Sequence, residues 1–281
     1  MKRIWDWYCN FSNRCKTSIH FLFAVFALVS TVMSVIGISL YDWTHHFWVR
    51  LLIIVCFAIV IYFCSYCAIG RIYKDSVSLK IRKTPITICC NDIFKTEGWK
   101  VIGCDTHYDT RVDDIVISKK SLHGQFVLNH GNIEEIKATV RNEGEKLGKV
   151  PDKNGLIEFP LGTIIPYHSS IDGQTYLLLA MTRLNSNHES HINMAEFEHM
   201  LMKMWNEIDR VYASNNIVLP LLGSGISRFD DGPKEDAALL KCMLCTLNTS
   251  GVSLNSEVII VLNSEAKDVP LYEFKEMFKS F

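Results

Sequence analysis

The chain has 281 residues, of which 48% are hydrophobic and 21% are charged, and its mean hydropathy is positive at +0.12. A chain this apolar is expected to contain membrane-spanning segments. Residues 1–84 carry ten Lys and Arg against three Asp and Glu, whereas the remainder carries 19 against 27. The acidic remainder argues against a nucleic-acid partner, because phosphate backbones require a basic face, while the basic part suits anionic lipid.

Two uncharged, apolar runs lie near the N-terminus, at residues 17–41 and 51–70. Each has about the 20 residues that a helix needs to cross the hydrocarbon layer. A pair of buried core helices is disfavoured because the rest of the chain supplies a full soluble domain. A cleaved signal peptide is disfavoured because the second run follows the first at once. Since the connector of residues 42–46 is very short, the sequence predicts a two-span transmembrane hairpin over residues 1–70.

Positive charges predict the orientation of this hairpin. Four Lys and Arg residues precede the first run and five follow the second within residues 71–84, whereas the connector contains none. Segments rich in Lys and Arg stay on the cytoplasmic side of a membrane. Both termini and the soluble remainder are therefore expected in the cytoplasm, with residues 42–46 outside and residues 71–84 as a basic linker.

The soluble remainder contains two strand-like runs, each followed by a polar motif. The run Ile86–Cys90 is followed by Asp92, whose carboxylate can accept a hydrogen bond from the amino group of a purine. The run Ile217–Leu219 leads into the loop Gly223–Gly225, in which two glycines flank a serine. Such a loop lets backbone N–H groups cradle an anion such as a diphosphate. Alone, it is more often an ordinary tight turn.

A further strand, Trp99–Cys104, leads into an acidic loop at residues 105–114 that also contains His107. A His among carboxylates can form an acid–base pair or a metal site. The alternative, which we favour over catalysis, is a solvated loop of turn-forming Asp residues. Ligand contact by part of this loop stays open. After the loop, Gly124 beside His123 either allows a ligand to approach the backbone closely or only marks a turn.

The other predicted elements alternate along the chain. Strands are predicted at residues 158–165, 176–182 and 257–262, and helices at residues 133–147, 193–214, 235–247 and 271–278. This alternation predicts an α/β fold, namely a three-layer α/β/α domain with a mixed sheet. Its ligand should lie outside the carboxyl ends of the central strands. The ten cysteines form no four-ligand zinc pattern and indicate a reduced cytoplasmic domain without a metal site.

The two polar motifs together resemble the macro domain, a family that binds ADP-ribose and its derivatives. Macro domains carry Gly-Asp-Ile after the first core strand, which Asp92 and Ile93 match with Asn91 in place of Gly. They also carry a Gly-Ser/Thr-Gly-hydrophobic loop, which residues 223–226 match. The resemblance covers residues 85–281 and implies that Asp92 binds adenine while the loop surrounds the diphosphate. The implied ligand-binding residues are Asp92, Ile93, Asp105, Leu122, His123, Gly124, Gly223, Ser224, Gly225, Ile226, Ser227 and Phe229.

The chain departs from catalytic members of this family after the second core strand. Those members carry an Asn-Ala-Ala-Asn run and a glycine-rich segment there, whereas this chain has Cys-Asp-Thr-His at residues 104–107. We therefore expect a receptor for an ADP-ribose derivative, with no catalytic residues and no cofactor. The alternatives are a membrane-tethered ADP-ribosyl hydrolase and a passive tether for ADP-ribosylated proteins.

Two membrane spans joined to a macro domain resemble the membrane-anchored effectors of bacterial Thoeris anti-phage systems. The segments NDIFKTEGWKVIGCD, DTRVDD, ISKKSLHGQF and PLLGSGISRF carry this resemblance. It implies a partner TIR-domain protein that makes a histidine–ADP-ribose signal from NAD. It also implies that the effector binds the signal, forms a homo-oligomer and disrupts the lipid bilayer. The implied location is the bacterial inner membrane, crossed twice, with both termini in the cytoplasm.

Overall fold

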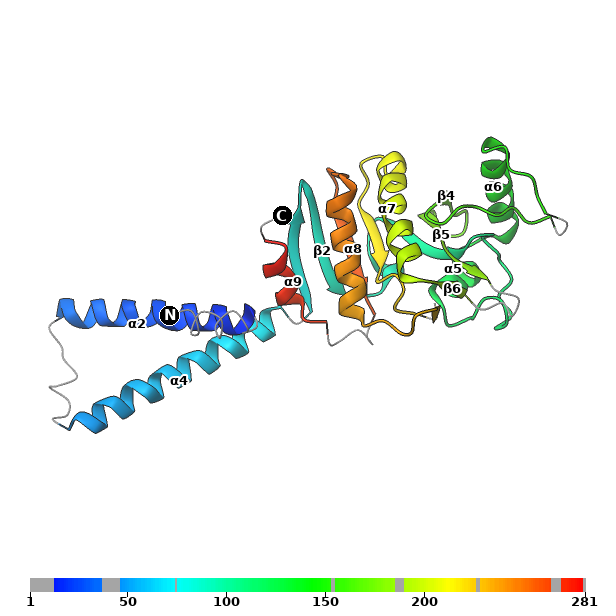
Figure 1. Cartoon of the computed structure of the whole chain (residues 1–281). Coiled ribbons are helices and arrows are strands. Elements are labelled where there is room, and N and C mark those ends of the chain that lie inside the picture. Colours follow the sequence, from blue (N-terminus) through cyan, green and yellow to red (C-terminus); the bar gives the residue numbers. More distant parts are fainter. Residues whose placement is uncertain are drawn as a thin grey trace. The chain divides into compact units, whose positions relative to one another are not determined.

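The computed structural model contains two compact units, residues 1–77 with 270–280 and residues 78–269 (Figure 1). The residues that the structure describes are 13–36, 46–73, 75–152, 155–184, 190–225, 228–263 and 269–279.

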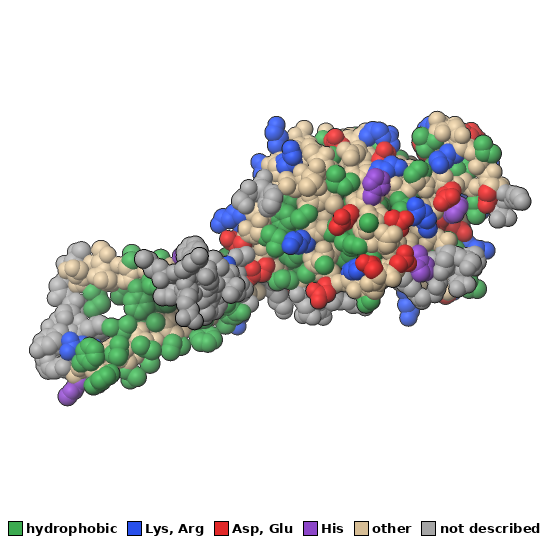
Figure 2. All heavy atoms as spheres, viewed as in Figure 1, with side chains coloured by type: hydrophobic (Ala, Val, Ile, Leu, Met, Phe, Trp, Pro, Cys, Tyr) green, Lys and Arg blue, Asp and Glu red, His purple; other side chains and the backbone are tan. Residues whose placement is uncertain are grey.

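The first unit contains two helices that are long and apolar enough to cross a membrane. Helix α2 (Asn13–Ile36) has 24 residues and α4 (Phe47–Ile72) has 26, and their candidate spans have mean hydropathies of 1.8 and 2.7. The rings of Phe26 and Phe57 join the two helices edge to face, with centroids 5.7 Å apart. Figure 2 shows the hydrophobic surface of α4, where Trp48 is 76% exposed. Such a surface suits lipid better than water. Residues 42–45 of the predicted connector lie outside the described part of the chain.

A third helix, α9 (Leu271–Met277), belongs to the same unit, packs on α2 and contacts Tyr73, the residue directly after α4. The Tyr272 hydroxyl donates to Thr17 Oγ1 on α2 at 2.7 Å. The Lys275 ammonium donates to the Tyr73 hydroxyl, directly after α4, at 2.7 Å and lies 4.4 Å from the centroid of that ring. The domain limits from the sequence, residues 1–70, 71–84 and 85–281, stay a prediction; in the structure α9 belongs to the same compact unit as α2 and α4.

The second unit is built on a mixed sheet, as the sequence predicted. The strand order is β1-β2-β9-β7-β3-β5-β6-β8, and β4 pairs with β5. Neighbours are parallel from β2 through β9, β7 and β3 to β5, whereas β4 and β6 run antiparallel to β5. The strands are β1 (Ser76–Ile81), β2 (Thr84–Cys90), β3 (Trp99–Asp105), β4 (Ile164–His168), β5 (Thr175–Leu184), β6 (Ser190–Ile192), β7 (Ile217–Pro220), β8 (Arg228–Phe229) and β9 (Val258–Leu262).

Two sequence predictions about strands differ from the structure. Strand β1 lies in the segment predicted as a linker. It forms a strand because Val77 and Ile81 are buried while exposed side chains lie between them, as in a strand with one buried face. The strand predicted at residues 158–165 begins only at Ile164. Pro160 has no N–H to give to a neighbouring strand, and Gly162 has φ of +80°, so the chain turns before the strand starts.

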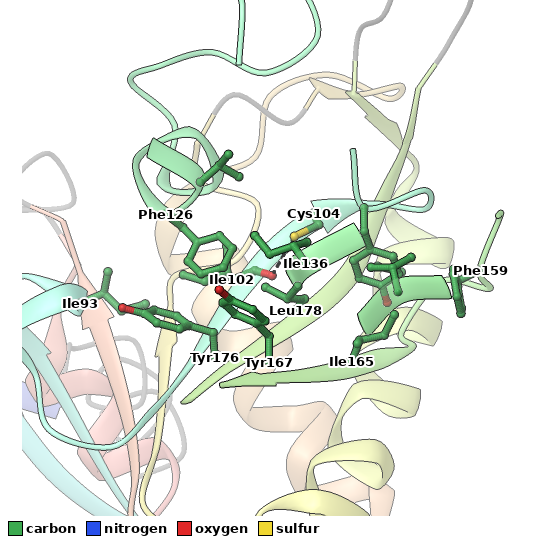
Figure 3. Packing of buried hydrophobic residues seen from close by; sticks show 14 of the residues in the cluster. Ile93, Ile102, Cys104, Phe126, Ile136, Phe159, Ile165, Tyr167, Tyr176 and Leu178 are labelled. Atoms are coloured by element: carbon green, nitrogen blue, oxygen red, sulfur yellow. Dashed lines mark hydrogen bonds between the residues drawn. The ribbon is translucent and has the colours of Figure 1, made fainter. Parts of the chain in front are cut away.

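Helices cover both faces of this sheet. On one face, α5 (Leu122–Asn129) and α6 (Ile133–Lys146) contribute Phe126 and Ile136 to a buried cluster with Ile102 of β3 and Leu178 of β5 (Figure 3). On the other face lie α7 (Met194–Val211) and α8 (Asp236–Ser250), joined by a hydrogen bond from the Trp205 indole to Thr246. Side chains alternate along a strand, so neighbours of Leu178 such as Leu177 face the opposite layer. The three-layer α/β/α arrangement is therefore confirmed.

Candidate ligand-binding site

The carboxyl ends of five parallel strands open into one cavity of about 1000 Å³. This is the edge at which ligands bind in open α/β sheets, because all the strands end there together. A residue in or directly after each strand lines the cavity: Asp92 after β2, Asp105 at the end of β3, Thr182 in β5, Leu221 after β7 and Asn263 after β9.

Asp92 is the residue directly before a short 3-10 helix, η1 (Ile93–Lys95), and its carboxylate caps that helix. Oδ1 accepts a hydrogen bond from the Phe94 amide at 3.0 Å, which caps the helix. Oδ2 lies 3.5 Å from the ammonium of Lys95, whose side chain is 81% exposed. This surface pair is weak. A carboxylate has about four acceptor sites, so Asp92 retains acceptors for a ligand. Ile93 also lines the cavity and joins the buried core beneath it.

The glycine loop forms another part of the wall. Gly223, Ser224 and Gly225 line the cavity, whereas the predicted contacts Ile226 and Ser227 lie outside the described residues. Gly223 has φ of +85°, which side-chain-bearing residues rarely adopt. Gly225 needs no such conformation, and a Cβ there would meet nothing within 4 Å.

Phe229, also among the predicted contacts, lies behind the loop. Its side chain is buried and does not line the cavity. Its ring supports the loop from behind, since a Cβ on Gly223 would lie 3.1 Å from it. On its other side it packs edge to face on Phe197 of α7, with centroids 5.4 Å apart. In the structure Phe229 therefore packs between the loop and α7.

The acidic loop after β3 uses its carboxylates to hold its own backbone. Asp105 lines the cavity, but Oδ1 accepts from the His107 amide at 2.7 Å and Oδ2 from the Asp109 amide at 3.1 Å. Asp113 accepts from two amides further along, which lowers the pKa of that carboxyl. Asp114 accepts from the Lys119 amide at 2.8 Å. Within the described residues no group of three or more His, Cys, Asp or Glu side chains is placed to hold a metal ion. The turn-forming interpretation of this loop agrees with these bonds.

Helix α5 begins at the cavity. Leu122 and His123 line it, but Gly124 does not. A Cβ on Gly124 would lie 2.2 Å from the carbonyl oxygen of Ser118, so this glycine permits close packing of the helix on the preceding loop. Burial lowers the pKa of His123, although the charges of Asp105 and Asp109 oppose the shift. The cavity therefore presents a neutral imidazole at neutral pH.

The sequence reasoning missed Lys120, which is the one Lys or Arg among the described residues that line the cavity. Its neighbour Lys119 pairs with Asp114 at 3.1 Å. The sequence did carry one signal for this position, because Ser121, which follows Lys120, caps α5 by accepting from the Gly124 amide. Lys120 gives the cavity a cation opposite to the charge of a phosphate.

Comparisons with known proteins place these features in context. A family model described as "Thoeris protein ThsA, Macro domain" matches residues 86–263. The Thoeris protein ThsA of Bacillus amyloliquefaciens (strain Y2) is 28% identical over 241 residues, covering 82% of this chain and 79% of that protein. A solved Oceanobacillus iheyensis macrodomain with MES bound has a TM-score of 0.51 at 16% identity, covering 73% of this chain and 98% of that one. The same macrodomain with ADP has a TM-score of 0.49 at 18% identity, covering 72% and 95%.

Proposed function

The chain belongs to the Thoeris ThsA macro-domain family, and we propose that it is a membrane-anchored receptor for an ADP-ribose-type signal. The observation that carries this proposal is the meeting of Asp92 and the loop Gly223–Gly225 at one cavity. These are the two motifs assigned to adenine and to a diphosphate. The cavity of about 1000 Å³ lies at the upper end of the range for small-molecule sites, which suits an extended dinucleotide-like ligand.

The charges of the cavity suggest how such a ligand would lie. The Asp92 carboxylate accepts from the amino group of adenine at one end. In the proposal, backbone amides of the glycine loop donate to the diphosphate, and Lys120 supplies a positive charge that offsets the phosphates. The neutral His123 adds a hydrogen-bonding group without a further charge. The ligand contacts proposed here are thus Asp92, Lys120, His123 and the loop Gly223–Gly225.

We propose binding without turnover. Residues 104–107 read Cys-Asp-Thr-His where catalytic members of the family carry an Asn-Ala-Ala-Asn run, and the Asp105 carboxylate holds its own loop by accepting backbone hydrogen bonds from His107 and Asp109. The competing function, a membrane-tethered ADP-ribosyl hydrolase, requires turnover of an ADP-ribosylated substrate.

The two apolar helices connect this receptor to the bilayer in the proposal. We place them as a two-pass anchor in the bacterial inner membrane, with both termini and the macro domain in the cytoplasm. A partner TIR protein supplies the signal, proposed to be histidine–ADP-ribose. Two helices alone cannot enclose a channel, so the signal acts by assembling many copies into a homo-oligomer that disrupts the membrane and aborts infection. For this the signal must bind the assembled state more tightly than the resting state. Anchoring in one membrane raises the local concentration of the domains.

The test uses the full chain in lipid nanodiscs. Calorimetry with ADP-ribose should show binding that Asp92→Ala weakens by about 1.5–3 kcal/mol, or roughly ten- to a hundredfold. The matched control Lys95→Ala removes only the exposed partner and should change the affinity less than about threefold. Equal affinity of the wild type and Asp92→Ala proteins would reject the site. Release of free ADP-ribose from an ADP-ribosylated substrate would favour the hydrolase.

A second experiment identifies the ligand and its effect. Protein co-expressed with a TIR partner should retain a small molecule that mass spectrometry identifies, and Asp92→Ala should lose it. The retained molecule should convert purified protein to large assemblies by light scattering and release dye from liposomes. Protein that stays monomeric when saturated would defeat the oligomerisation step while leaving the receptor function standing.

A further inference from the structure

The Asp92 carboxylate is linked to a second polar cluster through Phe94. The amide of Phe94 holds Asp92 Oδ1 at 3.0 Å, and the ring of the same residue stacks on the imidazole of His130. The two rings are nearly parallel, at 14°, and their centroids are 4.5 Å apart. His130 follows α5 directly and does not line the cavity. One residue therefore contacts the cavity carboxylate with its backbone and this histidine with its side chain.

The imidazole of His130 is itself fixed by the turn between β4 and β5. Its Nδ1 lies 2.8 Å from Asp172 Oδ2, and the Ser169 hydroxyl donates to the His130 carbonyl at 2.5 Å. The same oxygen of Asp172 accepts from the hydroxyl of Tyr176 at 2.7 Å. Tyr176 is fully buried in β5, within the cluster of Figure 3. The ring stacked on Phe94 is therefore anchored to a central strand of the sheet.

The pKa shifts in this cluster indicate which groups donate its hydrogen bonds and which group accepts them. Burial alone would raise the pKa of Asp172, but hydrogen bonds from Tyr176, the Gln174 amide and His130 outweigh it and lower that pKa. Burial, and then the neighbouring Asp172, raise the pKa of Tyr176. At neutral pH the carboxylate is thus ionised and accepts from a neutral hydroxyl. Because a carboxylate only accepts, His130 Nδ1 carries the proton that it donates to Asp172.

We propose that His130, held by Asp172 and Tyr176, is a positioning residue for Asp92. By stacking on Phe94 it fixes the amide that aims the Asp92 carboxylate into the cavity. The identity of the ligand rests on the proposed function, but the contacts between His130, Phe94 and Asp92 are present without a ligand. Aromatic stacking and one amide hydrogen bond orient a carboxylate that is otherwise half exposed, so the loss of either lets the side chain turn toward solvent.

The test is a double-mutant cycle on the full chain with ADP-ribose. His130→Ala should weaken binding about three- to tenfold in the wild-type protein and have no effect in Asp92→Ala, because the two residues act through one contact. His130→Phe keeps the stacking and should restore affinity to within about twofold of the wild type. An equal loss in both backgrounds, or a loss that His130→Phe does not repair, would overturn the positioning role.

A measurement without ligand separates this inference from the proposed function. Hydrogen exchange at the Phe94 amide reports directly on its bond to Asp92. His130→Ala should speed this exchange several-fold, and His130→Phe should return it toward the wild-type rate. Unchanged exchange in His130→Ala would overturn the inference whatever the ligand. Faster exchange in a protein that does not bind ADP-ribose would retain the positioning of Asp92 and reject the assigned ligand.

Discussion

The two glycines of the cavity loop, Gly223 and Gly225, should respond differently to the same substitution. Gly223 has φ of +85°, and a Cβ there would lie 3.1 Å from the ring of Phe229 and 3.4 Å from Leu239. Forcing an L-residue into this conformation costs about 1–2 kcal/mol, and crowding a buried ring adds to it, so Gly223→Ala should destabilise by roughly 2–3 kcal/mol. At Gly225 a Cβ meets nothing within 4 Å, so Gly225→Ala should be neutral or stabilise by up to about 1 kcal/mol.

Thermal unfolding of the full chain in detergent measures this difference. For a domain of this size about 1 kcal/mol corresponds to roughly 2–4 °C in Tm, so Gly223→Ala should lower Tm by about 4–12 °C and Gly225→Ala should not. Gly225→Val should leave Tm close to the wild-type value, yet weaken ADP-ribose binding because the larger side chain stands at the cavity wall. Equal Tm values for the two alanine variants would refute the conformational argument. Gly225→Val binding with wild-type affinity would refute the placement of the diphosphate.

Three further predictions concern other parts of the chain. Burial lowers the folded pKa of His123 below its ordinary 6.5, so the unfolded chain binds the proton more readily than the folded chain. The free energy of unfolding should therefore be highest above about pH 6.5 and fall below it, and His123→Gln should flatten this dependence in unfolding titrations between pH 7.5 and 5.5. Gly124→Ala should destabilise by at least about 2 kcal/mol in the same assay, because its Cβ would lie 2.2 Å from the Ser118 carbonyl, and a Tm near the wild type would contradict the close packing. A cysteine replacing Thr44, in a background with silent native cysteines, should react with an impermeant reagent outside intact cells, whereas labelling confined to the C-terminal domain would reverse the predicted topology.

The central sheet and the two cavity motifs could be predicted because their signals are local. Ile86–Cys90 and Ile217–Leu219 are β-branched runs that read as strands, and parallel strands bring the residues that follow them to one edge. The position of Phe229 could not be predicted in this way. It follows the loop in sequence, but which side of the loop a ring occupies depends on Phe197 in a distant helix.

The roles of Gly124 and His130 also depend on contacts between segments. Gly124 is required because the Ser118 carbonyl approaches it, and no periodicity in the sequence reports that approach. His130 gains its partner from a turn far along the chain, at Asp172, and its stacking partner from a segment well before it. Sequence patterns predict the local structure of a segment, whereas the roles of these two residues depend on contacts with other segments of the chain.

The position of α9 makes the second unit an insertion within the first. The chain leaves the two apolar helices at the end of α4, builds the whole second unit and returns at α9, where Tyr272 and Lys275 contact Thr17 and Tyr73. During synthesis, α2 and α4 are made first and α9 last. The contact between Tyr73 and Tyr272 therefore forms only after the whole second unit has been synthesised, so a chain that stops before α9 would carry the two apolar helices without these contacts.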